Sequence, residues 1–135
     1  MAELRIGVVG AGVMGGGIAQ CTAAAGYPTV CTDIAPAALE AARRDAEQGR
    51  FGLAGAVARG KLSAADADAA RARITWTQDF AAAAGCDLVI ECVPEKLETK
   101  LRVFRELDRV APAHAILASN TSGFPIAAMA GATSR

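Results

Sequence analysis

Three glycines near the N-terminus have the spacing of a phosphate-binding turn. The stretch GVVGAGVMGGGIAQ (residues 7–20) contains the pattern G-x-G-x-x-G at Gly10, Gly12 and Gly15. In this pattern the first glycine allows a tight turn and the second lets a diphosphate approach the backbone, while the third lets a helix pack closely against the sheet. The free N–H groups of the first helical turn, at about Val13 to Gly15, and the helix dipole favour the phosphate charge.

Two further glycines extend this run, and the three-glycine pattern does not account for them. Each glycine inside a helix costs roughly 1 kcal/mol relative to alanine. We expect Gly17 to give a second close approach of the helix to the sheet. For Gly16 the pattern indicates no role.

An acidic residue follows at the distance that a dinucleotide site requires. Asp33 lies 18 residues after Gly15, at the end of the second strand-like run, close to the expected spacing of ~20. A carboxylate there can accept both ribose hydroxyls of an adenosine and would repel a 2′-phosphate, and no arginine follows in DIAPAA. NAD(H) is therefore favoured over NADP(H). The alternative is that Asp33 is a turn or cap residue at the start of the next helix.

Strand-like and helix-like segments alternate along the chain and predict the elements that position these residues. Strands are expected at 4–9, 29–33, 74–76, 86–93 and 115–119, and helices at 13–25, 36–48, 96–109 and 125–130, with a small alanine-rich helix after residue 76. Residues 49–73 form a broken helical excursion in which Ser63 caps a short helix. This order predicts an α/β fold, a Rossmann-type doubly wound, mostly parallel sheet with a helical excursion between the second and third strands.

The composition excludes several classes of protein. The 135 residues suit one domain, and 53% hydrophobic with 21% charged residues indicate a globular chain. Fourteen basic residues balance fourteen acidic ones, so we expect no nucleic-acid partner. The apolar runs are too short to cross a bilayer, and the N-terminal MAELRIGVVG leaves no room for a signal peptide, so we expect no membrane partner.

The cysteines and the histidine indicate neither disulfides nor a metal site. Cys21, Cys31, Cys86 and Cys92 lie in apolar runs without C-x-x-C spacing, and we expect buried thiols. Unpaired cysteines favour a cytoplasmic location. His114 is the only histidine, which excludes a multi-histidine metal site, and no metal is expected.

Four stretches together resemble the N-terminal domain of the L-3-hydroxyacyl-CoA dehydrogenases, a family that includes the 3-hydroxybutyryl-CoA dehydrogenases. They are IGVVGAGVMGGGIAQ, VCTDI, CDLVIECVPEKLETK and ILASNTS, in the family's order. Members of this family oxidise the 3-hydroxyl of an acyl-CoA thioester, or reduce the ketone, with NAD as hydride carrier. The resemblance implies an NAD-binding domain over residues 1–135, an acyl-CoA substrate and a place in fatty acid β-oxidation.

The resemblance also implies which residues bind the cofactor. The turn from Gly10 to Gly15 would do so, Ala11 and Met14 included, and the Asp33 carboxylate would meet the adenine ribose. Glu95 and Lys100 follow the fourth strand at its carboxyl end, where ligands of open α/β sheets bind, and would line the nucleotide site. The alternative for both is a solvated helix start.

By the same resemblance, Ser122 is the active-site serine, because it ends the SNTS stretch. Its hydroxyl would hydrogen-bond the reacting substrate oxygen, which orients the substrate and stabilises developing charge. Asn120 would lie beside it, near the nicotinamide. The alternative for Ser122 is a turn or N-cap residue before the helix at Pro125. Gly123 stands where many relatives have a second serine, which bears on substrate preference.

The CoA moiety is expected to contact the helical excursion. Arg50, Arg59 and Lys61 are the candidates to meet its phosphates. The alternative is that these basic residues form an ordinary solvated face.

The family's histidine base, in a G-x-H-F-x-N-P strand, and its glutamate partner have no match in this chain. His114 precedes the fifth strand and cannot replace that base. We therefore expect a truncated NAD-binding domain that lacks the catalytic strand and the C-terminal helical domain and is inactive alone, from an enzyme that is a homodimer. In the strand order 3-2-1-4-5-6 the fifth strand, residues 115–119, would then be an exposed edge, which favours self-association.

Two other functions remain open at this point. The acyl group could be carried by an acyl carrier protein instead of CoA, because the thioester-binding surface lies largely elsewhere. The chain could also be a non-catalytic NAD-binding regulatory module. Ser122 and Asn120 argue against the module, because a sensor needs no hydroxyl aimed at a substrate.

Overall fold

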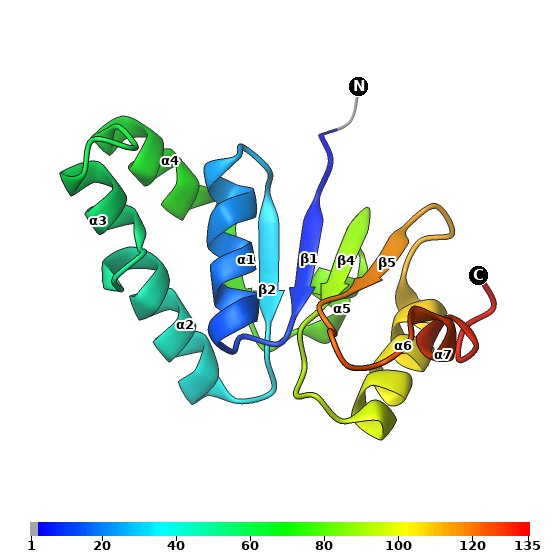
Figure 1. The fold of residues 1–135 in the computed structure, drawn as a ribbon. Helices are drawn as coiled ribbons and strands as arrows, with labels where there is room; N and C mark the ends of the chain where they lie inside the picture. The colour runs from blue at the N-terminus through cyan, green and yellow to red at the C-terminus, as the bar shows by residue number, and fades with distance from the viewer. Residues whose placement is uncertain (1–2) are drawn as a thin grey trace.

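A five-stranded parallel sheet forms the centre of the structure, a computed structural model that describes residues 3–135 (Figure 1). The strands are β1 (Ile6–Val9), β2 (Thr29–Thr32), β3 (Ile74–Thr77), β4 (Leu88–Glu91) and β5 (Ile116–Ser119). They lie in the order β3-β2-β1-β4-β5, and every neighbouring pair is parallel. The predicted order of the first five strands is therefore confirmed.

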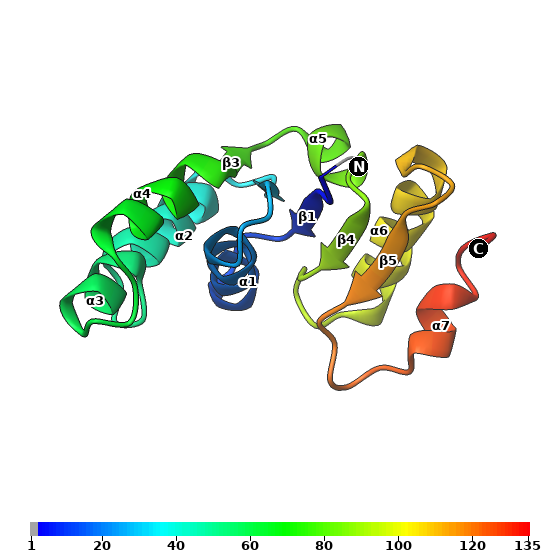
Figure 2. The ribbon, with the colours of Figure 1, turned by 90° about the horizontal axis from the view of Figure 1, so that it is seen from above.

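Seven helices connect and cover the strands within the described residues. They are α1 (Val13–Ala24), α2 (Pro36–Gln48), α3 (Leu53–Ala58), α4 (Ala64–Arg73), α5 (Phe80–Ala84), α6 (Leu97–Val110) and α7 (Ile126–Ala130). Viewed from above, α1 and α2 lie on one side of the sheet, and α5 and α6 lie on the other (Figure 2). Helices α3 and α4 form the predicted excursion between β2 and β3.

Successive side chains of β1 pack into the apolar clusters on opposite faces of the sheet. Ile6 and Val8 pack in a cluster with Ala19 of α1 and Leu39 of α2. Val9 belongs to the opposite cluster, which contains residues of α5 and α6. Because successive side chains of a strand point to opposite faces, a strand covered on both sides must be apolar throughout. The predicted doubly wound α/β fold is confirmed.

Local signals at the helix starts act as the sequence predicts. Pro36 opens α2, where its missing N–H has no helical partner to lose. Ser63 caps α4, because its hydroxyl accepts a hydrogen bond from the Asp66 N–H at 3.0 Å. These two signals fix where the helices begin on either side of α3.

The close approach expected at Gly17 occurs instead at Gly16. A Cβ added at Gly17 would meet nothing within 4 Å, so the prediction for this residue was wrong. A Cβ at Gly16 would lie 3.0 Å from Cβ of Ala42 in α2. Gly16 therefore lets α1 pack tightly against a helix and not against the sheet, a long-range contact that the sequence pattern did not indicate.

The prediction of buried thiols holds for two of the four cysteines. Cys31 and Cys86 are buried, Cys92 is half-buried and Cys21 is exposed, and all four are free. Cys21 lies on α1 two positions from the buried Ala19 and Ala23, and because residues four apart share one face of a helix, position 21 faces the opposite side. Burial raises the pKa of Cys31 to about 12 and that of Cys92 to about 11. Both thiols are therefore neutral at physiological pH.

The two edge strands differ in what covers them. On β3, Trp76, the sole tryptophan of the chain, packs against the core cluster of β1, α1 and α2. On β5, Ile116 is 66% exposed, as expected for an edge strand.

Among residues 3–135 no helix has the length and apolar content to cross a bilayer.

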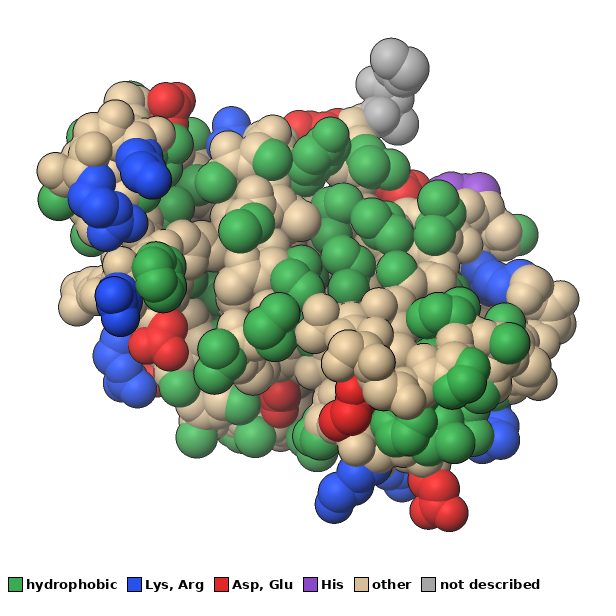
Figure 3. All heavy atoms as spheres, viewed as in Figure 1, with side chains coloured by type: hydrophobic (Ala, Val, Ile, Leu, Met, Phe, Trp, Pro, Cys, Tyr) green, Lys and Arg blue, Asp and Glu red, His purple; other side chains and the backbone are tan. Residues whose placement is uncertain are grey.

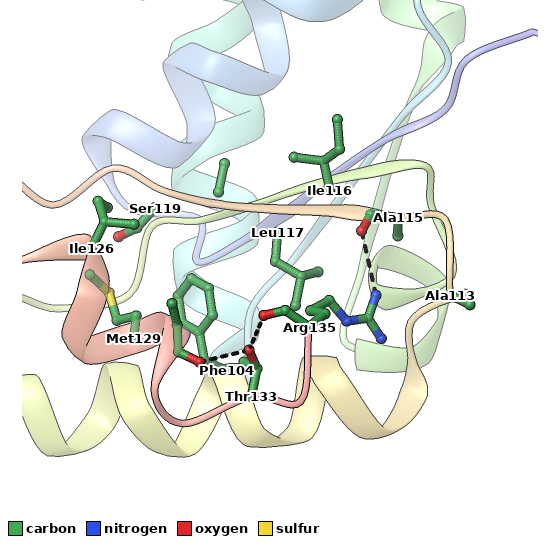
Figure 4. Close-up of a pocket in the computed structure, with 12 residues that line it drawn as sticks. Phe104, Ala113, Ala115, Ile116, Leu117, Ser119, Ile126, Met129, Thr133 and Arg135 are labelled. Atoms are coloured by element: carbon green, nitrogen blue, oxygen red, sulfur yellow. Dashed lines mark hydrogen bonds between the residues drawn. The ribbon is translucent and has the colours of Figure 1, made fainter.

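A small apolar cavity of about 300 Å³ lies between β5, α6 and α7 (Figure 4). Phe104 and Met129 are among the side chains that line it. Arg135 closes one end, where its guanidinium pairs with Asp108 at 2.8 Å and donates to the Ala115 carbonyl at 3.4 Å. The ion pair and the hydrogen bond of Arg135 therefore connect the last residues of the chain to α6 and to the start of β5.

Candidate functional site

The turn between β1 and α1, residues 10–15, requires glycine at two positions, and we call it the glycine turn. Gly10 has φ +107°, a conformation that side chains disfavour. A Cβ at Gly10 would lie 2.5 Å from the Cys92 carbonyl oxygen, and one at Gly15 would lie 1.7 Å from the Gly10 oxygen. The tight turn predicted at Gly10 and the close packing predicted at Gly15 are both confirmed.

Gly12 faces open space. A Cβ there would meet no atom within 4 Å, and Gly12 is the N-cap of α1 without any side-chain cap. The first N–H groups of a helix have no acceptor within the helix. Val13 and Met14, on that first turn, expose 90% and 57% of their surface. The backbone is therefore approachable where the sequence predicts a diphosphate, and the residues present fit such a group.

Asp33 points toward the glycine turn. One carboxylate oxygen, Oδ2, accepts the N–H of Ala11 at 2.8 Å, and Oδ1 accepts the N–H of Ala35 at 2.8 Å. Asp33 therefore has the structural role of the alternative interpretation, because it shapes the chain before α2. Each carboxylate oxygen keeps a second acceptor site, and Asp33 also lines the cavity described next. Its contact with a ribose remains a prediction.

A largely apolar cavity of about 730 Å³ lies at the carboxyl ends of β1, β2 and β4. Its size suits a small molecule. Its lining includes Gly10, Gly12, Asp33, Ile34, Gln78, Phe80, Cys92, Val93, Thr99, Arg102 and Val103. Ligands of open α/β sheets bind at this edge. Neither Glu95 nor Lys100 lines this cavity.

A second cavity, of about 520 Å³, lies on the other side of the glycine turn, between α1 and α2. Arg50 and Phe51 line it, and the Arg50 guanidinium lies over the Phe51 ring. Lys and Arg side chains gather over the nearby end of α2 and over α3 (Figure 3). Arg50, Arg59 and Lys61 are all exposed, so both interpretations of these basic residues stay open.

Lys100 is buried, which contradicts the alternative of a solvated helix start for this residue. Its side chain is 2% exposed, and Nζ lies 2.7 Å from Glu91 Oε2 and 3.2 Å from Glu95 Oε1. Nζ also donates to the Val93 carbonyl at 3.1 Å. Glu91, which is fully buried, was not among the predicted site residues. The available signal was a glutamate inside the apolar run CDLVIECV, because a buried charge requires a partner.

The end of β5 and the turn after it, residues 119–124, form a segment that we call the serine loop. The Ser119 hydroxyl donates to Glu91 Oε1 at 2.6 Å and accepts the Thr121 N–H at 3.1 Å. The Thr121 hydroxyl donates to Glu95 Oε1 at 2.9 Å and accepts the N–H groups of residues 123 and 124. Burial acts to raise the pKa of Glu95, but hydrogen bonds from Thr121 and Lys100 outweigh it, so this pKa is lowered.

Ser122 and Asn120 are brought to this same edge with unengaged side chains. Within residues 3–135 neither side chain makes a hydrogen bond to the protein, and Ser122 is exposed. The alternative that Ser122 is a cap is contradicted, because Thr121 makes the turn bonds and α7 has no side-chain cap. The predicted role of the Ser122 hydroxyl toward a substrate stays a prediction.

His114 lies far from this edge. Its Nε2 is 2.7 Å from Asp87 Oδ1, just before β4, at the amino ends of the strands. Hydrogen bonds from the Arg5 N–H and from His114 lower the pKa of Asp87. In the described part of the chain, no group of three or more His, Cys, Asp or Glu residues is arranged to hold a metal ion.

Residues 5–135 match the family described as 3-hydroxyacyl-CoA dehydrogenase, NAD binding domain. The chain is 39% identical over 131 residues to a probable 3-hydroxybutyryl-CoA dehydrogenase of Bacillus subtilis, a match that covers 97% of this chain and 45% of the relative. It is 42% identical over 130 residues to a 3-hydroxybutyryl-CoA dehydrogenase of Mycobacterium tuberculosis, which covers 96% of this chain and 44% of that protein. The chain thus spans about half the length of the curated relatives it matches.

Solved structures show the same fold. The crystal structure of M. tuberculosis FadB2 superposes with a TM-score of 0.90 at 41% identity, covering 99% of this chain and 46% of that chain. The (S)-3-hydroxybutyryl-CoA dehydrogenase PaaH1 from Ralstonia eutropha also gives a TM-score of 0.90, at 34% identity, with 99% of this chain and 46% of that chain covered. These matches confirm the Rossmann-type prediction and agree with NAD as the predicted cofactor.

Proposed function

This chain belongs to the 3-hydroxyacyl-CoA dehydrogenase family, as its NAD-binding domain, and we propose that it forms the cofactor-binding part of an enzyme that transfers a hydride between NAD and a 3-hydroxyacyl-CoA. One observation carries the proposal. The glycine turn and the serine loop both follow carboxyl ends of strands and so lie at one edge of the sheet (Figure 1), and the cavity that Asp33 lines lies at this same edge. Cofactor and substrate contacts would meet at that edge.

The glycine turn would hold the diphosphate of NAD, which supplies the hydride acceptor when bound. The backbone N–H groups of the first α1 turn provide donors, and Gly12 leaves the space they need. Asp33 would accept the adenine ribose hydroxyls with its remaining lone pairs. Glu95, whose side chain is 47% exposed, would line the nucleotide site.

The serine loop would orient the substrate. The free Ser122 hydroxyl would donate to the substrate oxygen that becomes a carbonyl, and Asn120 would lie beside it. Glu95 is poorly suited to take the hydroxyl proton, because its lowered pKa makes it a weak base. A further part of the protein would therefore supply the general base.

The relatives' length supports a longer protein with a second domain. This chain covers 45% of the B. subtilis relative. By the family resemblance, the histidine base would lie in a strand that follows residue 135, with its glutamate partner further on, and the helical second domain would supply the contacts of a homodimer. Sedimentation of the complete protein tests the homodimer.

The acyl-CoA substrate, β-oxidation and a cytoplasmic location complete the proposal. Relatives named 3-hydroxybutyryl-CoA dehydrogenases support a short-chain acyl-CoA. The four free cysteines suit a reducing compartment.

Titration calorimetry and a spectrophotometric assay test the proposal. We expect NADH to bind more tightly than NADPH, and the complete protein to oxidise NADH with acetoacetyl-CoA faster than with the matching acyl-carrier-protein thioester. Ser122→Ala should lower kcat about 100-fold while the Kd for NADH stays nearly unchanged. Binding of NADH without any turnover would favour the regulatory module, and absence of NADH binding by folded protein would refute the cofactor site.

A further inference from the structure

A connected network of charges and hydroxyls lies beneath the serine loop. Lys100 sits between two carboxylates, 2.7 Å from Glu91 Oε2 and 3.2 Å from Glu95 Oε1. Each carboxylate holds one hydroxyl of the loop. Glu91 accepts from Ser119, and Glu95 accepts from Thr121.

The inner half of this network is shielded from water. Glu91 is 0% exposed and Lys100 is 2% exposed. The Glu91 carboxylate is satisfied entirely by protein donors, which are Lys100 Nζ, the Val93 N–H at 2.7 Å and the Ser119 hydroxyl. Charge-assisted hydrogen bonds in such a site are short and directional, and no water is available to replace a lost partner. The position of Ser119 is therefore tightly defined.

Glu91 also determines the path of the backbone after Ser119. Because the Ser119 hydroxyl donates to the carboxylate, its oxygen is left to accept, and it receives the Thr121 N–H at 3.1 Å. The Asn120 N–H donates to the main-chain carbonyl of Glu91 at 2.9 Å. Two consecutive amides of the loop are thus held by one residue, directly or through one hydroxyl.

The loop alternates anchored and free side chains. Ser119 and Thr121 are anchored through their hydroxyls, whereas Asn120 and Ser122 make no side-chain hydrogen bond within residues 3–135. We infer that Glu91, charge-balanced by Lys100, is a positioning residue that fixes the serine loop so that Asn120 and Ser122 face the reacting groups. This inference rests on the proposed function, because it takes those two side chains as the ones that meet substrate and cofactor.

Ser119→Ala in the complete protein is the direct test. It removes the hydroxyl between Glu91 and the Thr121 amide but leaves the Lys100 ion pair intact. We expect kcat to fall about 10- to 100-fold, because small displacements of an orienting group have effects of that size. The Kd for NADH should change less than about 2-fold, since the glycine turn is untouched. Ser119→Thr keeps the hydroxyl and should restore most of kcat.

Thr22→Val is the matched control for stability. Thr22 also bonds through its hydroxyl, to Thr29 Oγ1 at 2.8 Å, but Thr29 begins β2, at the end of the sheet opposite the serine loop. We expect it to lower Tm as much as Ser119→Ala does and to leave kcat unchanged. Equal kcat in Ser119→Ala and wild type would overturn the inference, and so would an equal loss of kcat in both variants.

Amide hydrogen exchange separates the inference from the proposed function. Ser119→Ala and the isosteric Glu91→Gln should both speed exchange of the Thr121 N–H, by about 10-fold or more, while amides of α4 stay unchanged. If the wild-type protein has no turnover, the proposed function fails, and this exchange result still decides whether Glu91 holds the loop. Unaltered Thr121 exchange in both variants would overturn the positioning role.

Discussion

The glycine turn and the serine loop lie at the same edge of the sheet, but different interactions hold them in place. The turn depends mainly on backbone conformation and close packing. Glycines let it bend and pack, and a single carboxylate, Asp33, ties it to the end of β2. The loop depends on side-chain interactions. The buried Lys100 ammonium lies between two carboxylates, and each carboxylate accepts a hydrogen bond from one hydroxyl of the loop.

This difference indicates how each region should respond to change. The glycine turn should be sensitive to any added side-chain atom where its backbone is closely packed. It has few buried polar groups that a substitution could leave without a hydrogen-bond partner. A buried ion-pair site responds most when one charge is removed, because the other charge is then left without water or a partner. The four predictions below compare these two kinds of sensitivity, from the largest expected effect to the smallest.

Lys100→Met should destabilise the protein most. It leaves the fully buried Glu91 carboxylate without its ammonium, and breaking a buried pair in this way costs about 3–5 kcal/mol. Replacing both partners, Glu91→Leu with Lys100→Met, should recover much of the loss. Thermal unfolding measures these changes, with the exposed Lys96→Met as control. A Lys100→Met variant as stable as Lys96→Met would contradict the buried network.

Gly15→Ala should be the most damaging change in the glycine turn. Its Cβ would lie 1.7 Å from the Gly10 oxygen, and overpacking of this kind costs about 3 kcal/mol. Gly12→Ala is the matched control, because its Cβ meets no protein atom. That variant should fold normally yet bind NADH at least about 10-fold more weakly, a loss of about 1.4 kcal/mol. Equal stability of the two variants would show that the turn is less closely packed than described.

Asp33→Ala should weaken NADH binding by about 10-fold, since hydrogen bonds to a charged group contribute about 1.5 kcal/mol or more. The preference for NADH over NADPH should shrink as well. Asp79→Ala is the control, because Asp79 caps α5 through the Ala81 N–H but does not line the cavity. Calorimetric titration of both cofactors gives the comparison. An unchanged NADH/NADPH ratio would leave Asp33 with its structural role alone.

The smallest effect is a pH dependence at the outer end of the serine loop. Hydrogen bonds from Thr121 and Lys100 lower the pKa of Glu95 in the folded protein. The folded state therefore binds this proton less tightly than the unfolded chain does. The ionised Glu95 therefore contributes to the free energy of unfolding at neutral pH. This contribution is lost as the pH falls from the ordinary glutamate pKa toward the lowered pKa of the folded state. The Tm difference between wild type and Glu95→Gln should accordingly vanish in acid, and a pH-independent difference would rule out this linkage.

The two regions also differ in how far the sequence alone predicted them. The glycine turn follows from local constraints, because Gly10 must bend and Gly15 must pack within six residues of chain. The strand order and helix positions were equally predictable from alternating apolar runs and cap residues such as Ser63.

The serine loop was only partly predictable. Its location after β5 followed from the sequence, but the burial of Lys100 did not, and Glu91 was missed. Their contacts join residues that are 9 and 28 positions apart, and no local pattern encodes such pairings. The Gly16 contact with Ala42 was missed for the same reason.

Trp76 provides an intrinsic fluorescence signal near the proposed cofactor site. It is the sole indole of these 135 residues and packs on β3 against the core, and Gln78, two residues on, lines the same cavity as Asp33. Because reduced nicotinamide absorbs in the range where tryptophan emits, energy transfer should quench this one fluorophore whenever NADH occupies the protein. In this NAD-binding domain, cofactor occupancy could thus be followed without a label, through a tryptophan at a known position.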